Sequence, residues 1–194
     1  VSQVDETRTP IPGTEMIFDC DTLLLSVGLI PENELTRQAG IAIDPRTNGA
    51  VVYENMETSL PGVFACGNVA HVHDLVDFVT AESQQAGRAA ARFVLDGPGA
   101  DGPVLEIKNG GGVTYTVPQR IRIQQVGDSA GLFFRVNRVC GKSEIRVESK
   151  GQPIARFKRE HLAPGEMEHI VLPRVLLDKA SDEITVSIEE VKES

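Results

Sequence analysis

Gly67 and Asn68 form a pair whose residue types suit contact with an extended cofactor. They directly follow the apolar run at residues 62–66, and an amphipathic stretch begins nearby. Glycine lets a ligand approach the backbone closely, and the Asn68 amide can hydrogen-bond a sugar-like hydroxyl. The start of a following helix would add unpaired N–H groups and the positive end of a dipole. We therefore expect a cofactor contact at this turn.

His71, His73 and Asp74 come directly after the turn and suggest two further kinds of chemistry. Imidazole and carboxylate are common metal ligands, and i, i+2 spacing in an extended chain puts both imidazoles on one side. No other His or Cys cluster completes a coordination shell, because His161 and His169 lie far along the chain. We therefore predict no metal site. We interpret the pair first as structural loop histidines, and second as cofactor- or substrate-facing groups suited to proton transfer.

The cysteines give no sign of redox chemistry. Cys20, Cys66 and Cys140 are far apart and form neither a Cys-x-x-Cys nor a Cys-x4-Cys pair. An odd, sparse set argues against a disulfide framework and against a thiol redox pair within the chain. We interpret them as buried, reduced thiols of a cytoplasmic protein, and we assign no catalytic residue.

Short apolar runs place the candidate turn in an α/β pattern. Residues 22–27 form a continuous run that ends at Gly28, and residues 50–53 and 62–66 form two more. Runs of this kind are typical of strands buried on both faces of a parallel sheet. Residues 35–40 are expected to form a short helix that stops at Gly40.

Residues 77–95 are expected to form a helix that packs on this sheet. Asp74, Asp77 and Thr80 are each plausible N-caps of this helix. Small residues would allow close packing. The predicted packing face consists of Val79, Ser83, Ala86, Ala90, Phe93 and Val94.

A boundary follows this helix. Residues 96–103 contain three glycines and two prolines, which suit neither helix nor sheet. We therefore divide the chain into residues 1–97, a linker at 98–103 and residues 104–194. After the linker, polar and apolar residues alternate, and roughly seven short strands favour a small antiparallel sandwich. The clearest alternating runs are residues 119–124, 134–139, 144–148 and 183–189.

Composition and charge exclude some classes of protein. The chain is 41% hydrophobic and 24% charged, which is ordinary for a globular protein, and it has no apolar run near the roughly 20 residues of a membrane span. Its first residues show no secretion signal. Residues 1–103 hold 5 Lys and Arg against 15 Asp and Glu, whereas residues 104–194 hold 14 against 13. Neither part has the basic excess that nucleic-acid binding needs, so we predict neither nucleic acid nor membrane as a partner.

Four segments between residues 15 and 97 occur in an order that carries a family resemblance. Residues 58–70 read TSLPGVFACGNVA, residues 20–33 read CDTLLLSVGLIPEN, residues 86–90 read AGRAA and residues 71–77 read HVHDLVD. The first resembles the second flavin motif of the pyridine nucleotide-disulfide oxidoreductase superfamily. The second and third look like the strand leaving the nicotinamide domain and the last flavin-domain helix. The fourth is similar to the NADH-oxidase-like and sarcosine- or opine-oxidase-like branch.

The resemblance implies FAD and NAD(P) as cofactors of the intact flavoenzyme and a glutathione-reductase-like fold. Gly67 and Asn68 would meet the ribityl and pyrophosphate region of the flavin. The backbone of Val79 and Thr80, at the helix start, would face the pyrimidine edge of the isoalloxazine. Asn68 stands where the family usually has aspartate, which removes a negative charge from the site.

Much of the family's cofactor site is missing from the sequence. Neither Gly-x-Gly-x-x-Gly fingerprint occurs, and neither does the redox cysteine pair. Gly110, Gly111 and Gly112 precede a β pattern, so we predict a turn there. We therefore expect an α+β chain: the C-terminal part of an FAD/NAD(P)-binding α/β domain, followed by a small antiparallel β-sandwich.

Two functions follow from this organisation. In the first, the chain is the C-terminal fragment of an FAD-dependent, NAD(P)H-linked oxidoreductase, inactive and without bound cofactor by itself. Its partners would be the rest of the flavoenzyme, other subunits or a second copy. Its first half is then expected to be partly disordered or to bury its apolar strands against another copy. The alternative is a non-catalytic β-sandwich module for binding or subunit association.

Overall fold

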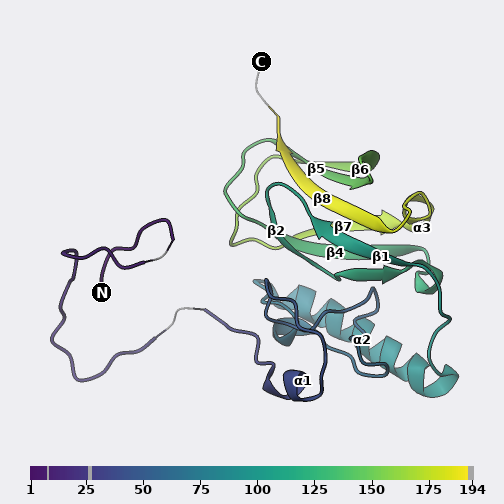
Figure 1. Cartoon of the computed structure of the whole chain (residues 1–194), viewed down its shortest axis with the longest axis horizontal. Helices are drawn as coiled ribbons and strands as arrows, with labels where there is room; N and C mark the ends of the chain where they lie inside the picture. The colour runs from purple at the N-terminus through teal and green to yellow at the C-terminus, as the bar shows by residue number, and fades with distance from the viewer. Residues whose placement is uncertain (8, 26–27, 192–194) are drawn as a thin grey trace.

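The structure, a computed structural model, describes residues 1–7, 9–25 and 28–191. An arm, which we define as the described residues between 1 and 30, precedes a body of helices and two sheets (Figure 1). The described hydrogen bonds of residues 1–25 all join residues of that same segment, for example Ile11 N–H to the Gln3 carbonyl at 2.8 Å. No helix in the described ranges is long and apolar enough to cross a membrane.

The strand predicted at residues 22–27 is not found where the structure describes it. Residues 22–25 belong to no strand, and Leu23, Leu24 and Leu25 are 73%, 89% and 72% exposed. Residues 26 and 27 lie outside the described residues. A buried parallel strand needs hydrogen-bonded neighbours on both sides, and the described part of the chain offers none. Cys20 is exposed as well, so the expectation of a buried thiol is wrong there.

The elements that lead to the candidate turn are short. The predicted helix at residues 35–40 is confirmed as α1 (Glu34–Gln38), and Gly40 follows with φ +74°. The predicted strands at residues 50–53 and 62–66 are wrong as full strands. Each is reduced to isolated bridges, which pair Ile43 with Ala50, Val52 with Thr58, and Glu57 with Phe64. The turn itself forms a single helical turn, η1 (Gly67–Val69).

The predicted long helix is confirmed as α2 (Val76–Asp96). It ends where Gly97 adopts φ +80° and donates its N–H to the Phe93 carbonyl at 3.0 Å. The packing face differs from the prediction. Glu82, Ala86 and Ala89 are buried, whereas Ser83 and Val94 are exposed.

The second half of the chain, which we call the β unit (residues 104–191 as described), contains two sheets (Figure 1). One has the order β3-β1-β8-β5-β6 and the other the order β2-β4-β7. Because β1 pairs with β8 in parallel, the larger sheet is mixed, which corrects the prediction of an antiparallel unit. Gly110–112 form the predicted turn between β1 and β2, and Gly112 has φ +83°. The elements are β1 (Val104–Asn109), β2 (Val113–Val117), β3 (Arg120–Arg122), η2 (Ile123–Gln125), β4 (Ser129–Val136), β5 (Ser143–Ser149), β6 (Gln152–Arg159), β7 (Glu168–Pro173), α3 (Arg174–Leu177) and β8 (Glu183–Glu190).

Two hydrophobic cores hold the body together. The larger draws on both sheets, with Leu105 and Ile184 from one and Leu132 and Leu172 from the other. The period-two alternation of the strands explains this core, because each strand turns every second side chain inward. In β5, for example, buried and half-buried residues alternate. The smaller core joins the two halves of the chain. Its members are Ile41, Ala50, Val52, Met56, Ala70, Ala86, Tyr115, Val117 and Met167.

Candidate functional site

The turn at Gly67 and Asn68 is built by a backbone conformation that favours glycine. Gly67 has φ +69° and is buried, and a Cβ at this position would lie 3.3 Å from Cγ1 of Val79. The structure thus brings Gly67 and Val79 together. Asn68 is exposed, and its Oδ1 accepts a hydrogen bond from the His73 N–H at 3.0 Å. This bond fixes the loop between the turn and α2.

The start of α2 differs from the sequence-based prediction. The N-cap is Leu75, and no side chain among the described residues caps it. Thr80 lies one turn inside the helix and donates its hydroxyl to the Val76 carbonyl at 3.0 Å, so its placement at the helix start is wrong. Since a helix leaves its first N–H groups without intrahelical partners, those groups belong to the residues around Val76 rather than to Thr80.

Asp74 also has a different role from the predicted cap. Its two carboxylate oxygens each accept from the Met167 N–H at 3.2 Å, and Oδ1 lies 3.3 Å from the Arg135 guanidinium. Arg135 further donates to the Val72 carbonyl at 3.1 Å. Together these contacts tie the loop before α2 to the β unit.

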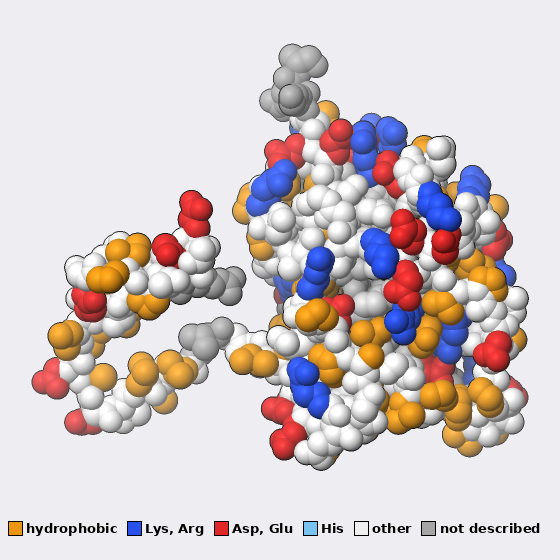
Figure 2. Space-filling model, in the orientation of Figure 1, with side chains coloured by type: hydrophobic (Ala, Val, Ile, Leu, Met, Phe, Trp, Pro, Cys, Tyr) orange, Lys and Arg blue, Asp and Glu red, His pale blue; other side chains and the backbone are white. Residues whose placement is uncertain are grey.

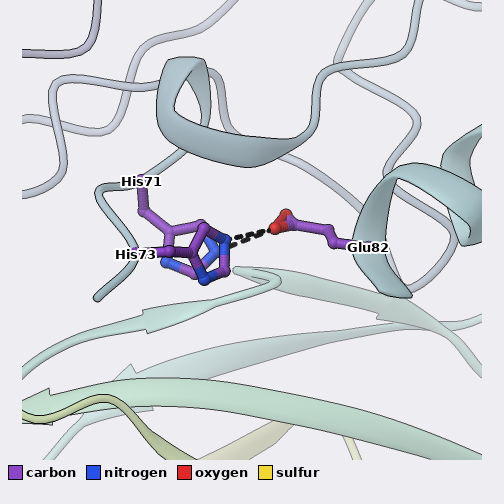
Figure 3. Close-up of side chains that lie close together, drawn as sticks. All are labelled: His71, His73 and Glu82. Carbon is purple, nitrogen blue, oxygen red and sulfur yellow. Dashed lines mark hydrogen bonds and ion pairs between the residues drawn. The ribbon is translucent and has the colours of Figure 1, made fainter. Parts of the chain in front are cut away.

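The side chains of two histidines of this loop lie together with that of a glutamate. The Nε2 of His73 is 2.5 Å from Oε2 of Glu82, and the Nε2 of His71 is 3.4 Å from the same oxygen (Figure 3). The three side chains are at most 1% exposed. The histidines come from the loop and Glu82 from α2, and we call this group the His–Glu cluster. It is the one arrangement of three such ligand types brought together among the described residues.

Burial and mutual contact set the charges of the cluster. Burial lowers the pKa of His71 below its ordinary value, against the opposing effect of its contact with Glu82. Burial alone would raise the pKa of Glu82, but its contacts with His71 and His73 outweigh that effect and lower the pKa. Near neutral pH, His71 is therefore neutral and Glu82 is a carboxylate.

Aromatic rings enclose the cluster on the side of the β unit. The ring of His71 meets that of Tyr115 edge-on with centroids 6.0 Å apart, and the ring of His73 meets that of Phe133 at 5.7 Å. Phe133 in turn stacks on His169 at 4.4 Å. A cavity of about 490 Å³ borders Glu82, Phe133 and His169.

Sequence reasoning located part of this site and missed the rest. It singled out His71 and His73 and considered Asp74 as the accompanying carboxylate, but it missed Glu82, which is the carboxylate that the structure places beside them. One signal was present, since Glu82 lies three residues after Val79 and four before Ala86, on the apolar face of a predicted helix. The aromatic partners Tyr115 and Phe133 come from strands far along the chain, and no local pattern relates them to the histidines.

The comparison with protein families agrees with the predicted resemblance. Residues 1–91 match the family described as pyridine nucleotide-disulphide oxidoreductase. The resemblance of this part of the chain to that family is therefore confirmed.

Individual relatives are oxidoreductase components of larger size. The chain is 27% identical to the glutamate synthase (NADPH) small chain of Mycobacterium tuberculosis, over 54% of this chain and 22% of that protein. It is 31% identical to the ferredoxin reductase component of chlorobenzene dioxygenase from Cupriavidus sp. strain PS12, over 59% and 27%. It is 42% identical to putidaredoxin reductase of Pseudomonas putida, over 36% and 14%. The chain thus spans about a quarter or less of these relatives. No solved structure matches it significantly.

Proposed function

We propose that this chain supplies the last flavin-contact segment of an FAD-dependent, NAD(P)H-linked oxidoreductase. The observation that carries the proposal is the order of motifs at residues 58–91 inside the family match of residues 1–91. The relatives are named as reductase, oxidase or synthase components, which supports the same class of reaction. The sparse cysteines support a cytoplasmic location.

The residues at the turn fit one edge of a flavin. Gly67 is buried and holds the turn in a left-handed conformation that a residue with a side chain would strain. Asn68 presents an exposed amide that can bond a ribityl hydroxyl. The start of α2, with no side-chain cap among the described residues, leaves N–H groups for an electron-rich acceptor. Val79 supports the turn through its contact with Gly67, and we keep Thr80 as a weaker candidate.

The rest of the cofactor site must come from elsewhere. When bound, FAD accepts hydride from the nicotinamide and supplies the redox chemistry. The chain contains neither Gly-x-Gly-x-x-Gly fingerprint for the two dinucleotides. We therefore propose that it is a fragment, inactive alone, that works with further sequence of the same flavoenzyme or with partner subunits. The β unit would be an accessory β-sandwich in that assembly.

One observation favours the second candidate function, an association module. Hydrophobic side chains of the arm are exposed, with Ile17 at 94% and Leu24 at 89%. Figure 2 shows hydrophobic side chains along the part of the arm that lies apart from the body. Exposed apolar surface of this kind marks contact with another protein surface. This observation suits a subunit-association role with or without flavin chemistry.

Two measurements test the proposed function. The purified chain should show no flavin absorbance in the visible spectrum, and stoichiometric bound FAD would overturn its description as an incomplete site. The intact protein of the same reading frame should carry an upstream Gly-x-Gly-x-x-Gly and reduce an artificial electron acceptor with NAD(P)H.

In that protein, Asn68→Leu should weaken FAD retention, while Asn68→Asp, the usual family residue, should preserve it. Equal FAD retention in both variants would remove Asn68 from the site.

A further inference from the structure

We propose that His71, His73 and Glu82 bind a divalent transition-metal ion. Two imidazoles and one carboxylate form a ligand set that suits Zn²⁺ and neighbouring first-row ions, with positions left open for water or another ligand. The inference stands on the cluster's own geometry and does not depend on the proposed flavin chemistry.

The ligand atoms are close enough to share one ion. One nitrogen from each ring and one carboxylate oxygen lie within 4.8 Å of one another. Bonds of about 2.0–2.2 Å to a tetrahedral ion hold ligand atoms roughly 3–4 Å apart. The 3.4 Å between His71 Nε2 and Glu82 Oε2 already falls in this range. His73 Nε2 is closer to that oxygen, at 2.5 Å, so the Glu82 carboxylate must turn away from His73 slightly or bind through Oε1.

Unsatisfied polar atoms point to a missing ligand. Among the described residues, both nitrogens of His71, the Nδ1 of His73 and the Oε1 of Glu82 are buried without a hydrogen-bond partner. Each such atom costs about 1–3 kcal/mol when nothing compensates it. An ion at the centre of the cluster would take up lone pairs from His71 Nε2 and from the carboxylate. It would thereby compensate His71 Nε2 and the Glu82 carboxylate, whereas the Nδ1 atoms of His71 and His73 gain no partner from the ion.

The ligands are held in place before any ion arrives. His73 is fixed through its backbone by Asn68, and the Val72 carbonyl between the histidines accepts from Arg135. Packing against Tyr115 and Phe133 restrains the two rings. Such restraint replaces the hydrogen bond that usually orients a metal-bound imidazole. Because the rotamers are already restricted, binding loses little conformational entropy.

The chemistry of the ligand set also suits a cation. Two imidazoles and one carboxylate supply three donor atoms and one negative charge. The opposing interpretation is a metal-free group in which His73 and Glu82 share a hydrogen bond, and the experiment below separates the two.

The test uses the full 194-residue chain, stripped of metal with a chelator and titrated with Zn²⁺ by calorimetry. One ion should bind per chain. At a hundredfold excess of free Zn²⁺ over Kd, the Tm should rise by roughly 5–10 °C. Titration with Co²⁺ should give visible d–d bands, and X-ray absorption should show nitrogen and oxygen ligands including imidazole. Absence of binding, or ligation without imidazole, would establish the metal-free interpretation.

Variants assign the ligands. His73→Gln and Glu82→Gln should each weaken Zn²⁺ binding by more than about 100-fold. Removing only a hydrogen-bond partner of a metal-bound imidazole costs roughly 10–100-fold in affinity, and loss of a ligand should cost more. His161→Gln is the matched control, because His161 is exposed in the β unit, and its Zn²⁺ affinity should equal that of the unaltered chain. Circular dichroism verifies that each variant is folded. If a variant is unfolded, the Co²⁺ spectrum of the unaltered chain still decides the proposal. Unchanged affinity in a folded Glu82→Gln variant would overturn it.

Discussion

The Nη1 of Arg122 lies 2.6 Å from Oε2 of Glu57 and joins β3 to the loop that precedes the candidate turn. The same guanidinium donates to Glu54 at 3.2 Å and to Asn55 at 2.7 Å, and it lies 4.2 Å from the ring centroid of Tyr53. The Arg122 side chain is 14% exposed, and the carboxylates of Glu54 and Glu57 belong to side chains exposed by 5% and 7%. Charges largely removed from water therefore anchor residues 53–57 to the β unit.

Replacing Arg122 with alanine should lower the free energy of unfolding by about 3 kcal/mol, because removal of one partner leaves buried charges uncompensated. Denaturant unfolding followed by circular dichroism measures the change. Arg120→Ala is the matched control, since its pair with Glu106 is more exposed, at 34% and 43%. This control should cost less than about 1 kcal/mol. Equal losses would show that burial does not set the strength of the Arg122 network.

Alanine substitutions at two glycines should change the stability of the chain in opposite directions. A Cβ at Gly49 would lie 1.7 Å from the carbonyl oxygen of Ala70, a backbone atom directly before His71. Gly49→Ala should therefore destabilise the chain by about 3 kcal/mol, the upper end of the usual cost of overpacking. Gly87 is exposed on α2, and a Cβ added there would meet no described atom of a neighbouring element within 4 Å. Gly87→Ala should stabilise the chain by about 0.5–1 kcal/mol.

Thermal unfolding of both glycine variants at one pH measures this contrast. A folded Gly49→Ala variant with unchanged Tm would contradict the close packing of Gly49 against Ala70. A lower Tm for Gly87→Ala would contradict the open surroundings of Gly87.

The β unit could be predicted from sequence to a large extent because its signal is local. The alternating residues of β5 and β8 face a core and solvent in turn, and the structure follows that alternation. The parallel pairing of β1 with β8 was not predictable in the same way. β1 and β8 are the first and last strands of the β unit, so their pairing joins segments that are far apart in the sequence. Period-two alternation also contains no information on strand direction.

In residues 1–97, by contrast, the sequence alone predicts less of the structure. The run at residues 22–25 has the composition of a buried strand, but burial depends on neighbouring strands that the described chain does not provide. The family motif predicts a flavin contact at Gly67 and Asn68, and it contains no signal for the His–Glu cluster. Glu82 interrupts an apolar helix face, and it gains its two histidine partners only when the loop carrying His71 and His73 folds over it.

Acidification should destabilise the chain partly through His169. Burial, with a further contribution from Arg159, lowers the pKa of His169 below 6.5. The unfolded state therefore binds a proton more readily than the folded state, so this contribution to stability is present above pH 6.5. It is lost as the pH falls from 6.5 toward the folded-state pKa, with a limiting slope of about 1.4 kcal/mol per pH unit.

Denaturant unfolding of the chain and of His169→Gln, measured from about pH 7.5 downward with chelator present, isolates this effect. The variant should lose less stability below pH 6.5 than the unaltered chain. The exposed His161 serves as control, and His161→Gln should retain the original pH dependence. Identical curves for His169→Gln and the unaltered chain would show that His169 titrates alike in both states.

The arm should make the isolated chain self-associate. Ile17 and Leu24 are 94% and 89% exposed, and burial of each such side chain stabilises a complex by about 1.5–3 kcal/mol. The double variant Ile17→Ser, Leu24→Ser should raise the dissociation constant at least about tenfold in sedimentation velocity experiments. The control Val94→Ser, Leu95→Ser removes equally apolar side chains, both 82% exposed, from the end of α2, and it should leave association unchanged. A chain that stays monomeric across the concentration series would contradict the arm's role, and a larger effect of the control would move the contact to α2.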